Sequence, residues 1–182
     1  YLLPLQLGEC SNNGVICQEE ICYLKVGRTY TNPIISDKSV PDPTVIRAND
    51  GYFYLYATQT STYWMPIYRS KDLVNWEYQK TAFTQATKPS LSGGGAFWAP
   101  EMTYINGKYV LYFSWAKMNG ADVSYTAVAV SDSPLGPFPN SKALITNEEF
   151  GSNVIDQFYY EENGKKYMFF GSFKGIYVTE LT

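Results

Sequence analysis

The chain has 182 residues, a formal net charge of −3 and no histidine. The weak negative charge argues against nucleic-acid binding, because phosphate contacts need a basic face and the 14 Lys and Arg residues are scattered, with no cluster larger than the pair Lys165-Lys166. The lack of histidine excludes a Ser-His-Asp or Cys-His mechanism and most zinc sites within these residues. Acid–base chemistry therefore falls to carboxylates, lysine or tyrosine. The 17 tyrosines suit both β-strands and the apolar faces of sugars.

The first 29 residues are predicted to form a separate N-terminal segment. Residues 1–7 are apolar and fit either a capping β-strand or the remnant of a secretory signal. The spacing of Cys10, Cys17 and Cys22 matches no metal motif. Two alternatives stay open for their redox state: one disulfide with a free thiol, or three reduced thiols. No run of about 18 apolar residues exists, so no membrane span is predicted.

Three later segments share one pattern of strand, tight turn and strand. They span residues 41–56, 99–113 and 154–170, and their turns are Asp50-Gly51, Asn106-Gly107 and Asn163-Gly164. These dipeptides supply the positive φ angles that hairpin turns need. Each segment continues into a third strand, and residues 76–78 fit a short fourth one.

Four antiparallel strands in a repeated unit are typical of a β-propeller blade. The sequence therefore predicts an all-β domain over residues 30–182, with blades at about 40–90, 97–147 and 153–182. The third unit ends before its outer strand, so the chain is expected to hold about two and a half blades of a longer protein. A closed ring needs at least four blades.

An acidic residue stands near the start of each unit: Asp42, Glu101 and Asp156, separated by 59 and 55 residues. The first strand of a blade lies nearest the propeller axis, so we expect these carboxylates to face one cavity. Bringing carboxylates together costs free energy through their mutual repulsion and desolvation. The arrangement is useful when it gives the acids unequal pKa values, so that one stays ionised and another stays protonated. Hydrolysis of a glycosidic bond needs this division. An ordinary turn between two prolines is the alternative for Asp42, and a structural hydrogen bond is the alternative for Glu101.

Around these acids the chain resembles glycoside hydrolase family 43. The resemblance rests on residues 40–56 with Asp42, residues 97–109 with Glu101, and residues 153–172 with Asp156, and it extends over about residues 30–182. It implies a five-bladed β-propeller and an inverting O-glycosyl hydrolase of the arabinanase, arabinofuranosidase or β-xylosidase type. The implied substrates are plant polysaccharides that contain arabinose or xylose.

The resemblance also implies roles for single residues. Asp42 matches the general base, and Asp156 matches the residue that tunes the pKa of the general acid. That acid is a glutamate of a later blade in the family, so it is expected to be absent from these residues. Phe97, Trp98 and Glu101 are predicted to contact the substrate, with burial between blades as the alternative for Trp98.

No cofactor is expected to be required, although the resemblance allows a structural calcium ion, and no metal-ligand set is found in the sequence. The expected partner is an oligo- or polysaccharide, with a secreted, periplasmic or cell-surface location. The first alternative is a carbohydrate-binding propeller without turnover. The second is a related fructoside-cleaving enzyme, which is disfavoured because residues 41–44 lack the Asn-Asp-Pro-Asn-Gly type of motif. Arabinan versus xylan, and exo versus endo action, stay open, as do the cysteine redox state and the oligomeric state.

Overall fold

The computed structural model describes residues 15–18, 21–24, 30–36, 38–93, 95–117, 123–151 and 153–182. Its backbone divides into two compact units, Tyr1–Ile34 and Ile35–Thr182. In the first unit, β1 (Val15–Gln18) pairs antiparallel with β2 (Ile21–Leu24). This register places Cys17 opposite Cys22 along the backbone. Residues 1–7 and Cys10, which carry the predicted capping strand or signal remnant and the third thiol, lie outside the described residues.

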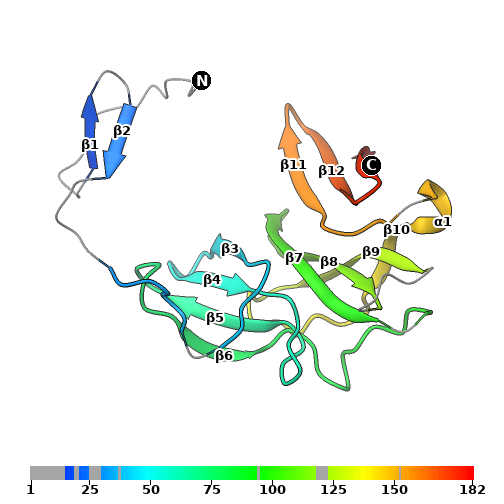
Figure 1. Ribbon diagram of the computed structural model, residues 1–182, viewed down its shortest axis with the longest axis horizontal. Helices are drawn as coiled ribbons and strands as arrows, with labels where there is room; N and C mark the ends of the chain where they lie inside the picture. Colours follow the sequence, from blue (N-terminus) through cyan, green and yellow to red (C-terminus); the bar gives the residue numbers. More distant parts are fainter. Residues whose placement is uncertain are drawn as a thin grey trace. The chain divides into compact units, whose positions relative to one another are not determined.

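The second unit consists of three antiparallel sheets that follow one another along the chain (Figure 1). The first sheet contains β3 (Thr44–Arg47), β4 (Phe53–Tyr56), β5 (Pro66–Ser70) and β6 (Glu77–Thr81). The second contains β7 (Ala96–Ile105), β8 (Lys108–Ala116), β9 (Ser124–Ser131) and β10 (Lys142–Thr146), followed by the short helix α1 (Asn147–Phe150). The third contains β11 (Phe158–Glu162), β12 (Lys165–Ser172) and β13 (Gly175–Leu181). Within each sheet, neighbouring strands are consecutive in sequence, as in a propeller blade, which confirms the predicted all-β chain of about two and a half blades.

The predicted hairpin turns form in two different ways. Asn106-Gly107 and Asn163-Gly164 have positive φ at both residues, which is the two-residue turn that matches strand twist. At the Asp50-Gly51 turn of the first blade, only Gly51 of these two residues has positive φ. A hydrogen bond from Ala48 N to Tyr52 O there closes a three-residue loop, a common alternative when a glycine takes the left-handed position. The loop length sets the register of β3 against β4.

Aromatic side chains fill the space between neighbouring blades. Between the first and second blades, the rings of Phe83 and Phe97 stack with their centroids 4.5 Å apart. Between the second and third blades, Tyr112 and Tyr159 stack at 5.9 Å. Fully burying such a side chain contributes about 1.5–3 kcal/mol, so these contacts hold the blades in a fixed relation. The first strands of the blades are positioned by this packing.

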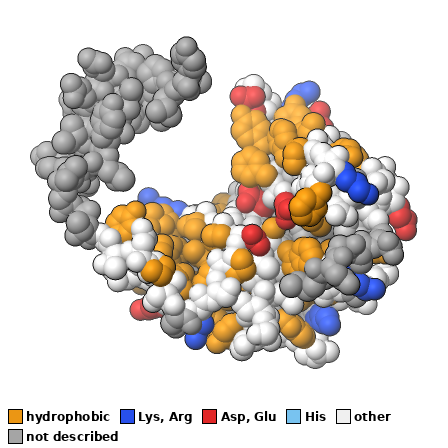
Figure 2. Space-filling model, in the orientation of Figure 1, with side chains coloured by type: hydrophobic (Ala, Val, Ile, Leu, Met, Phe, Trp, Pro, Cys, Tyr) orange, Lys and Arg blue, Asp and Glu red, His pale blue; other side chains and the backbone are white. Residues whose placement is uncertain are grey.

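The third blade has an aromatic residue at the same register position as the first two blades, but there this residue is exposed. Tyr56, Tyr112 and Phe169 occupy corresponding register positions, opposite the first strand of each blade. Their exposed fractions are 0%, 5% and 38%. Val178, which pairs with Phe169, is also exposed, and Figure 2 shows hydrophobic side chains over this sheet. This side of the third blade therefore has the chemistry of a contact between blades.

Candidate active site

Three residues at the start of the blades share an uncommon backbone conformation. Asp42, Ala99 and Asp156 have φ angles of 50°, 40° and 58°. Positive φ is rare for residues other than glycine, costs about 1–3 kcal/mol and is concentrated at functional sites. The three residues are evenly spaced, since 99 − 42 and 156 − 99 both equal 57. They therefore hold equivalent places in successive blades.

Glu101 does not hold this place, which corrects the alignment of the acids made from the sequence. Ala99 is the second member of the set, and Glu101 lies two residues further along β7. By hydrogen-bond register, the counterparts of Glu101 in the other blades are Thr44 and Phe158. The sequence aligns the units by charge, whereas the backbone repeats at the positive-φ residue two positions before Thr44, Glu101 and Phe158.

Asp42 is exposed at this position and is held by Thr58. The Thr58 hydroxyl donates to Asp42 Oδ2 at 2.7 Å. The Thr58 backbone N–H donates to the carbonyl oxygen of Pro41 at 3.0 Å. The Asp42 carboxylate is therefore both exposed and oriented.

Asp156 occupies the same place in the third blade as Asp42 does in the first. Its backbone N–H donates to Ser114 Oγ at 2.9 Å, and the residue as a whole is exposed while its carboxyl group is partly buried. Partial burial raises the pKa of Asp156, and the negative charge of Asp42 raises it further. Acidic groups gather near the middle of the face drawn in Figure 2, where β7 contacts both β3 and β11 (Figure 1).

Glu101 ties the first strands of three blades together. The Thr44 hydroxyl donates to Glu101 Oε2 at 3.2 Å, and the backbone N–H of Tyr159 also donates to this carboxylate. Burial raises the pKa of Glu101, while these two hydrogen bonds lower it. Glu101 therefore accepts hydrogen bonds that connect neighbouring blades, while its contact with substrate stays a prediction.

The two aromatic residues predicted to contact sugar differ in environment. Phe97 is 1% exposed and packs against Phe83, Phe113 and Trp115. Its ring has no open face for a sugar, so the structure corrects the prediction that Phe97 is a platform. Trp98 is partly exposed, and its buried indole Nε1 has no hydrogen-bond partner among the described residues. Trp98 remains the predicted platform.

Three polar residues that the sequence analysis does not single out support the two aspartates: Thr58, Ser114 and Gln157. Ser114 and Gln157 are buried, so they need partners. Ser114 Oγ donates to Gln157 Oε1 at 3.0 Å, and Gln157 Nε2 donates to the carbonyl oxygen of Ala99. Serine and threonine are ordinary strand residues and carry no signal. A glutamine next to Asp156 in an apolar stretch is the cue that sequence reasoning missed.

We expect Asp156→Asn to stabilise the protein at neutral pH. Because the folded-state pKa of Asp156 is raised, its contribution to stability is full below its unfolded pKa and is lost as the pH rises through the folded value. Asparagine cannot ionise, and it tolerates positive φ as aspartate does. The melting temperature should rise by roughly 1–3 °C at about pH 7 and stay unchanged at about pH 3, measured by calorimetry.

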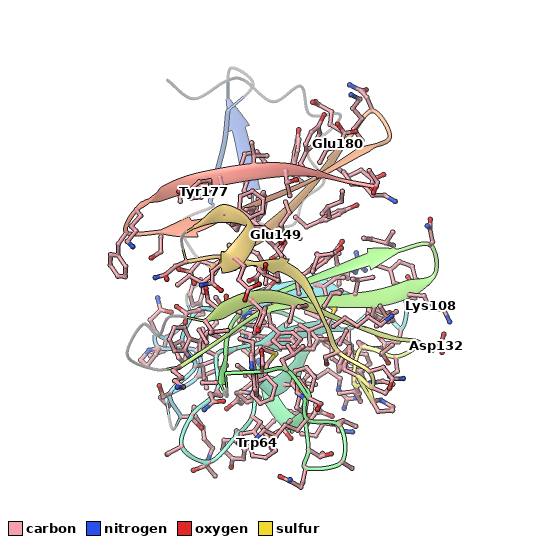
Figure 3. All side chains as sticks on the ribbon, turned by 90° about the vertical axis from the view of Figure 1, so that its right-hand side faces the viewer. Trp64, Lys108, Asp132, Glu149, Tyr177 and Glu180 are labelled. Atoms are coloured by element: carbon pink, nitrogen blue, oxygen red, sulfur yellow. The ribbon has the colours of Figure 1, made fainter. Side chains whose placement is uncertain are left out.

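Asp132→Asn is the matched control for this measurement. The Asp132 side chain is 84% exposed and pairs with Lys108, beside which it lies in Figure 3. Its pairing lies near the Asn106-Gly107 turn, at the opposite end of β7 from Ala99. This variant should show no gain at neutral pH. An equal gain at both pH values for Asp156→Asn would contradict the electrostatic explanation.

The structure also bears on metal and membrane binding. Among the described residues, no group of three or more Cys, Asp or Glu side chains is placed to hold a metal ion. Within the same part of the chain, no helix is long and apolar enough to cross a membrane.

Comparison with known proteins gives one family. The sequence model described as "Glycosyl hydrolases family 43" matches residues 30–182. The extracellular endo-α-(1→5)-L-arabinanase 1 of Bacillus subtilis is 30% identical over 156 residues, which are 80% of this chain and 47% of that protein. The xylan 1,3-β-xylosidase of a Vibrio species is 31% identical over 150 residues, which are 77% of this chain and 26% of that protein.

Solved structures give the same result. A native arabinanase from Bacillus subtilis has a TM-score of 0.66 at 28% identity, covering 81% of this chain and 53% of the other. An α-L-arabinanase of Cellvibrio cellulosa in complex with arabinohexaose has a TM-score of 0.64 at 29% identity, covering 81% and 49%. The predicted fold, a five-bladed propeller of which this chain holds about two and a half blades, is confirmed. The chain spans about half the length of these arabinanases and a quarter of the xylosidase.

Proposed function

Because this chain belongs to glycosyl hydrolases family 43, we propose that the complete protein hydrolyses glycosidic bonds in plant polysaccharides that contain arabinose or xylose. The observation that carries the proposal is the pair Asp42 and Asp156. They stand at equivalent bends of two blades, and the charge of one raises the pKa of the other. Glycosidic bond hydrolysis requires carboxyl groups with distinct roles, and this pair supplies two of the proposed three, the general acid coming from a further blade.

In the proposed mechanism, Asp42 is the general base of a single displacement. It takes a proton from a water molecule that attacks the anomeric carbon, and the configuration inverts. The leaving oxygen receives its proton from a general acid, which we propose is a glutamate of a further blade. In inverting enzymes the two carboxyl groups lie about 6.5–9.5 Å apart to admit the water.

Asp156 serves the general acid in this scheme. A negative charge near a carboxyl group raises the pKa of that group and keeps it protonated at neutral pH. Asp156 is therefore proposed to raise the pKa of the glutamate and to help orient it. Trp98 is proposed to stack on a sugar ring, since flat aromatic rings cover the apolar faces of sugars.

The relatives support the substrate class and the location. One is named an arabinanase and another a xylosidase, and several are named extracellular. We propose an oligo- or polysaccharide substrate and a secreted, periplasmic or cell-surface protein. The scheme uses carboxylates alone and requires no cofactor, while a calcium ion remains compatible with it as a structural element.

The test is an assay of the complete protein on linear arabinan, arabinoxylan and nitrophenyl pentosides. We expect hydrolysis of at least one of these, with the inverted anomer as first product in proton NMR spectra. A product with retained configuration would overturn the mechanism. Binding without any turnover on all three would instead support a carbohydrate-binding propeller.

A further inference from the structure

Thr58 links Asp42 to the second blade through its hydroxyl group. The Thr58 hydroxyl donates to Asp42 Oδ2 at 2.7 Å and accepts a hydrogen bond from the backbone N–H of Ala99, also at 2.7 Å. The N–H can only donate, so the hydroxyl must accept on that side. Its single proton is then available to Asp42. The backbone of the second blade thus sets the direction of the bond to the carboxylate.

Ala99 in turn is held by the third blade. Its carbonyl oxygen accepts from Gln157 Nε2, while Gln157 Oε1 accepts from the Ser114 hydroxyl at 3.0 Å. Ser114 Oγ accepts the backbone N–H of Asp156 at 2.9 Å. The Asp156 N–H donates to Ser114, Ser114 donates to Gln157 and Gln157 donates to Ala99, so these bonds run in series through the Gln157 amide, and bonds in series strengthen one another. With its positive φ, Ala99 donates its N–H to Thr58 of the first blade and accepts at its carbonyl oxygen from Gln157 of the third blade.

The same device occurs in two successive blades. A hydroxyl within two residues of the end of the second strand of one blade accepts the N–H of the positive-φ residue of the next blade: Thr58 for Ala99, and Ser114 for Asp156. Thr58 differs because it also donates to a carboxylate. Holding the blades together does not require that second bond.

We propose that Thr58 is a positioning residue for the general base. It holds Asp42 by Oδ2 so that Oδ1 faces the water molecule and takes its proton. Among the residues that the structure describes, none donates a hydrogen bond to Oδ1. The inference rests on the proposed function, in which Asp42 is that base. A base held in the attacking geometry removes the orientational part of the barrier.

The test compares Thr58→Val with Thr58→Ser in the complete protein, assayed on whichever of the three polysaccharide or pentoside substrates the wild type hydrolyses. Valine keeps the shape and loses the hydroxyl, so we expect kcat to fall about 10- to 100-fold, the range for a hydrogen bond to a charged group. KM should stay within about 2-fold, because Thr58 acts on the base rather than on the sugar. Serine keeps the hydroxyl and should restore kcat to within about 3-fold of the wild type.

Gln59→Leu is the matched control. Gln59 Oε1 accepts the backbone N–H of Phe97 at 2.9 Å, so its loss removes a bond between the same two blades without touching Asp42. We expect a lowered melting temperature, similar to that of Thr58→Val, with kcat unchanged. A fall in kcat equal to that of Thr58→Val would assign the effect to blade packing and overturn the proposal.

A second pair of variants covers a failure of Thr58→Val to fold. Thr58→Ala leaves room for a water molecule at the Ala99 N–H and should show the same loss of kcat. In the Asp42→Ala background, adding Thr58→Ala should change the residual rate by less than about 2-fold, because residues that act as a unit are not additive. Full activity of Thr58→Ala together with an inactive Asp42→Ala would contradict this inference and leave the proposed function intact. Absence of hydrolysis in the wild type, or an active Asp42→Ala variant, would contradict both the proposed function and this inference.

Discussion

Asp42→Ala in the complete protein is expected to lower kcat by about 10²- to 10⁴-fold, the usual contribution of a general base. The affinity for oligosaccharide should change little, because the sugar is held by other groups, so catalysis and binding separate. Initial rates on the best substrate measure the first quantity, and isothermal titration calorimetry with the matching oligosaccharide measures the second. Loss of binding together with turnover would contradict the assignment of Asp42 as the base.

Two companion variants make this result specific. Asp42→Asn keeps the size of the side chain and tolerates the positive φ of 50°, yet cannot take a proton, so it should be about as inactive as the alanine variant. Asp132→Asn removes an exposed carboxylate near the Asn106-Gly107 turn and should keep full activity. Turnover by Asp42→Asn close to that of the wild type would remove Asp42 from the mechanism.

Phe97→Ala is expected to lower the free energy of unfolding by about 3–5 kcal/mol, the usual cost of deleting a buried aromatic ring. The ring is 1% exposed, stacks on Phe83 at 4.5 Å and meets Trp115 edge-on at 5.0 Å. Its removal leaves a cavity between the first and second blades. Chemical denaturation followed by tryptophan fluorescence measures the change.

Graded and surface substitutions test whether packing is the cause. Phe97→Leu keeps much of the apolar volume and should cost less than Phe97→Ala, with KM for the sugar unchanged. Val130→Ala, at an exposed position of β9, should change stability by less than about 0.5 kcal/mol. A raised KM with normal stability in Phe97→Leu would restore Phe97 as a sugar platform and contradict the buried role.

The sequence predicted the blades because the information for them is local. Hairpin turns at Asn106-Gly107 and Asn163-Gly164 depend on neighbouring residues, and alternating apolar residues mark the strands. The same local reading misaligned Glu101, since it compared charges and had no access to φ angles. It also placed Phe97 beside Trp98 at the sugar, although successive residues of a strand point to opposite faces.

The amino-acid sequence by itself determined an all-β repeat, a family and the two aspartates that open its first and third units. Only the tertiary structure decided which groups stand around them. Thr58, Ser114 and Gln157 are remote in sequence from the residues they orient or are hidden among ordinary strand residues, and they become partners when the blades pack side by side. The physical reason is that a hydrogen bond between blades depends on distances of about 3 Å. Such distances are set by the packing of aromatic side chains between the blades, which no short motif encodes.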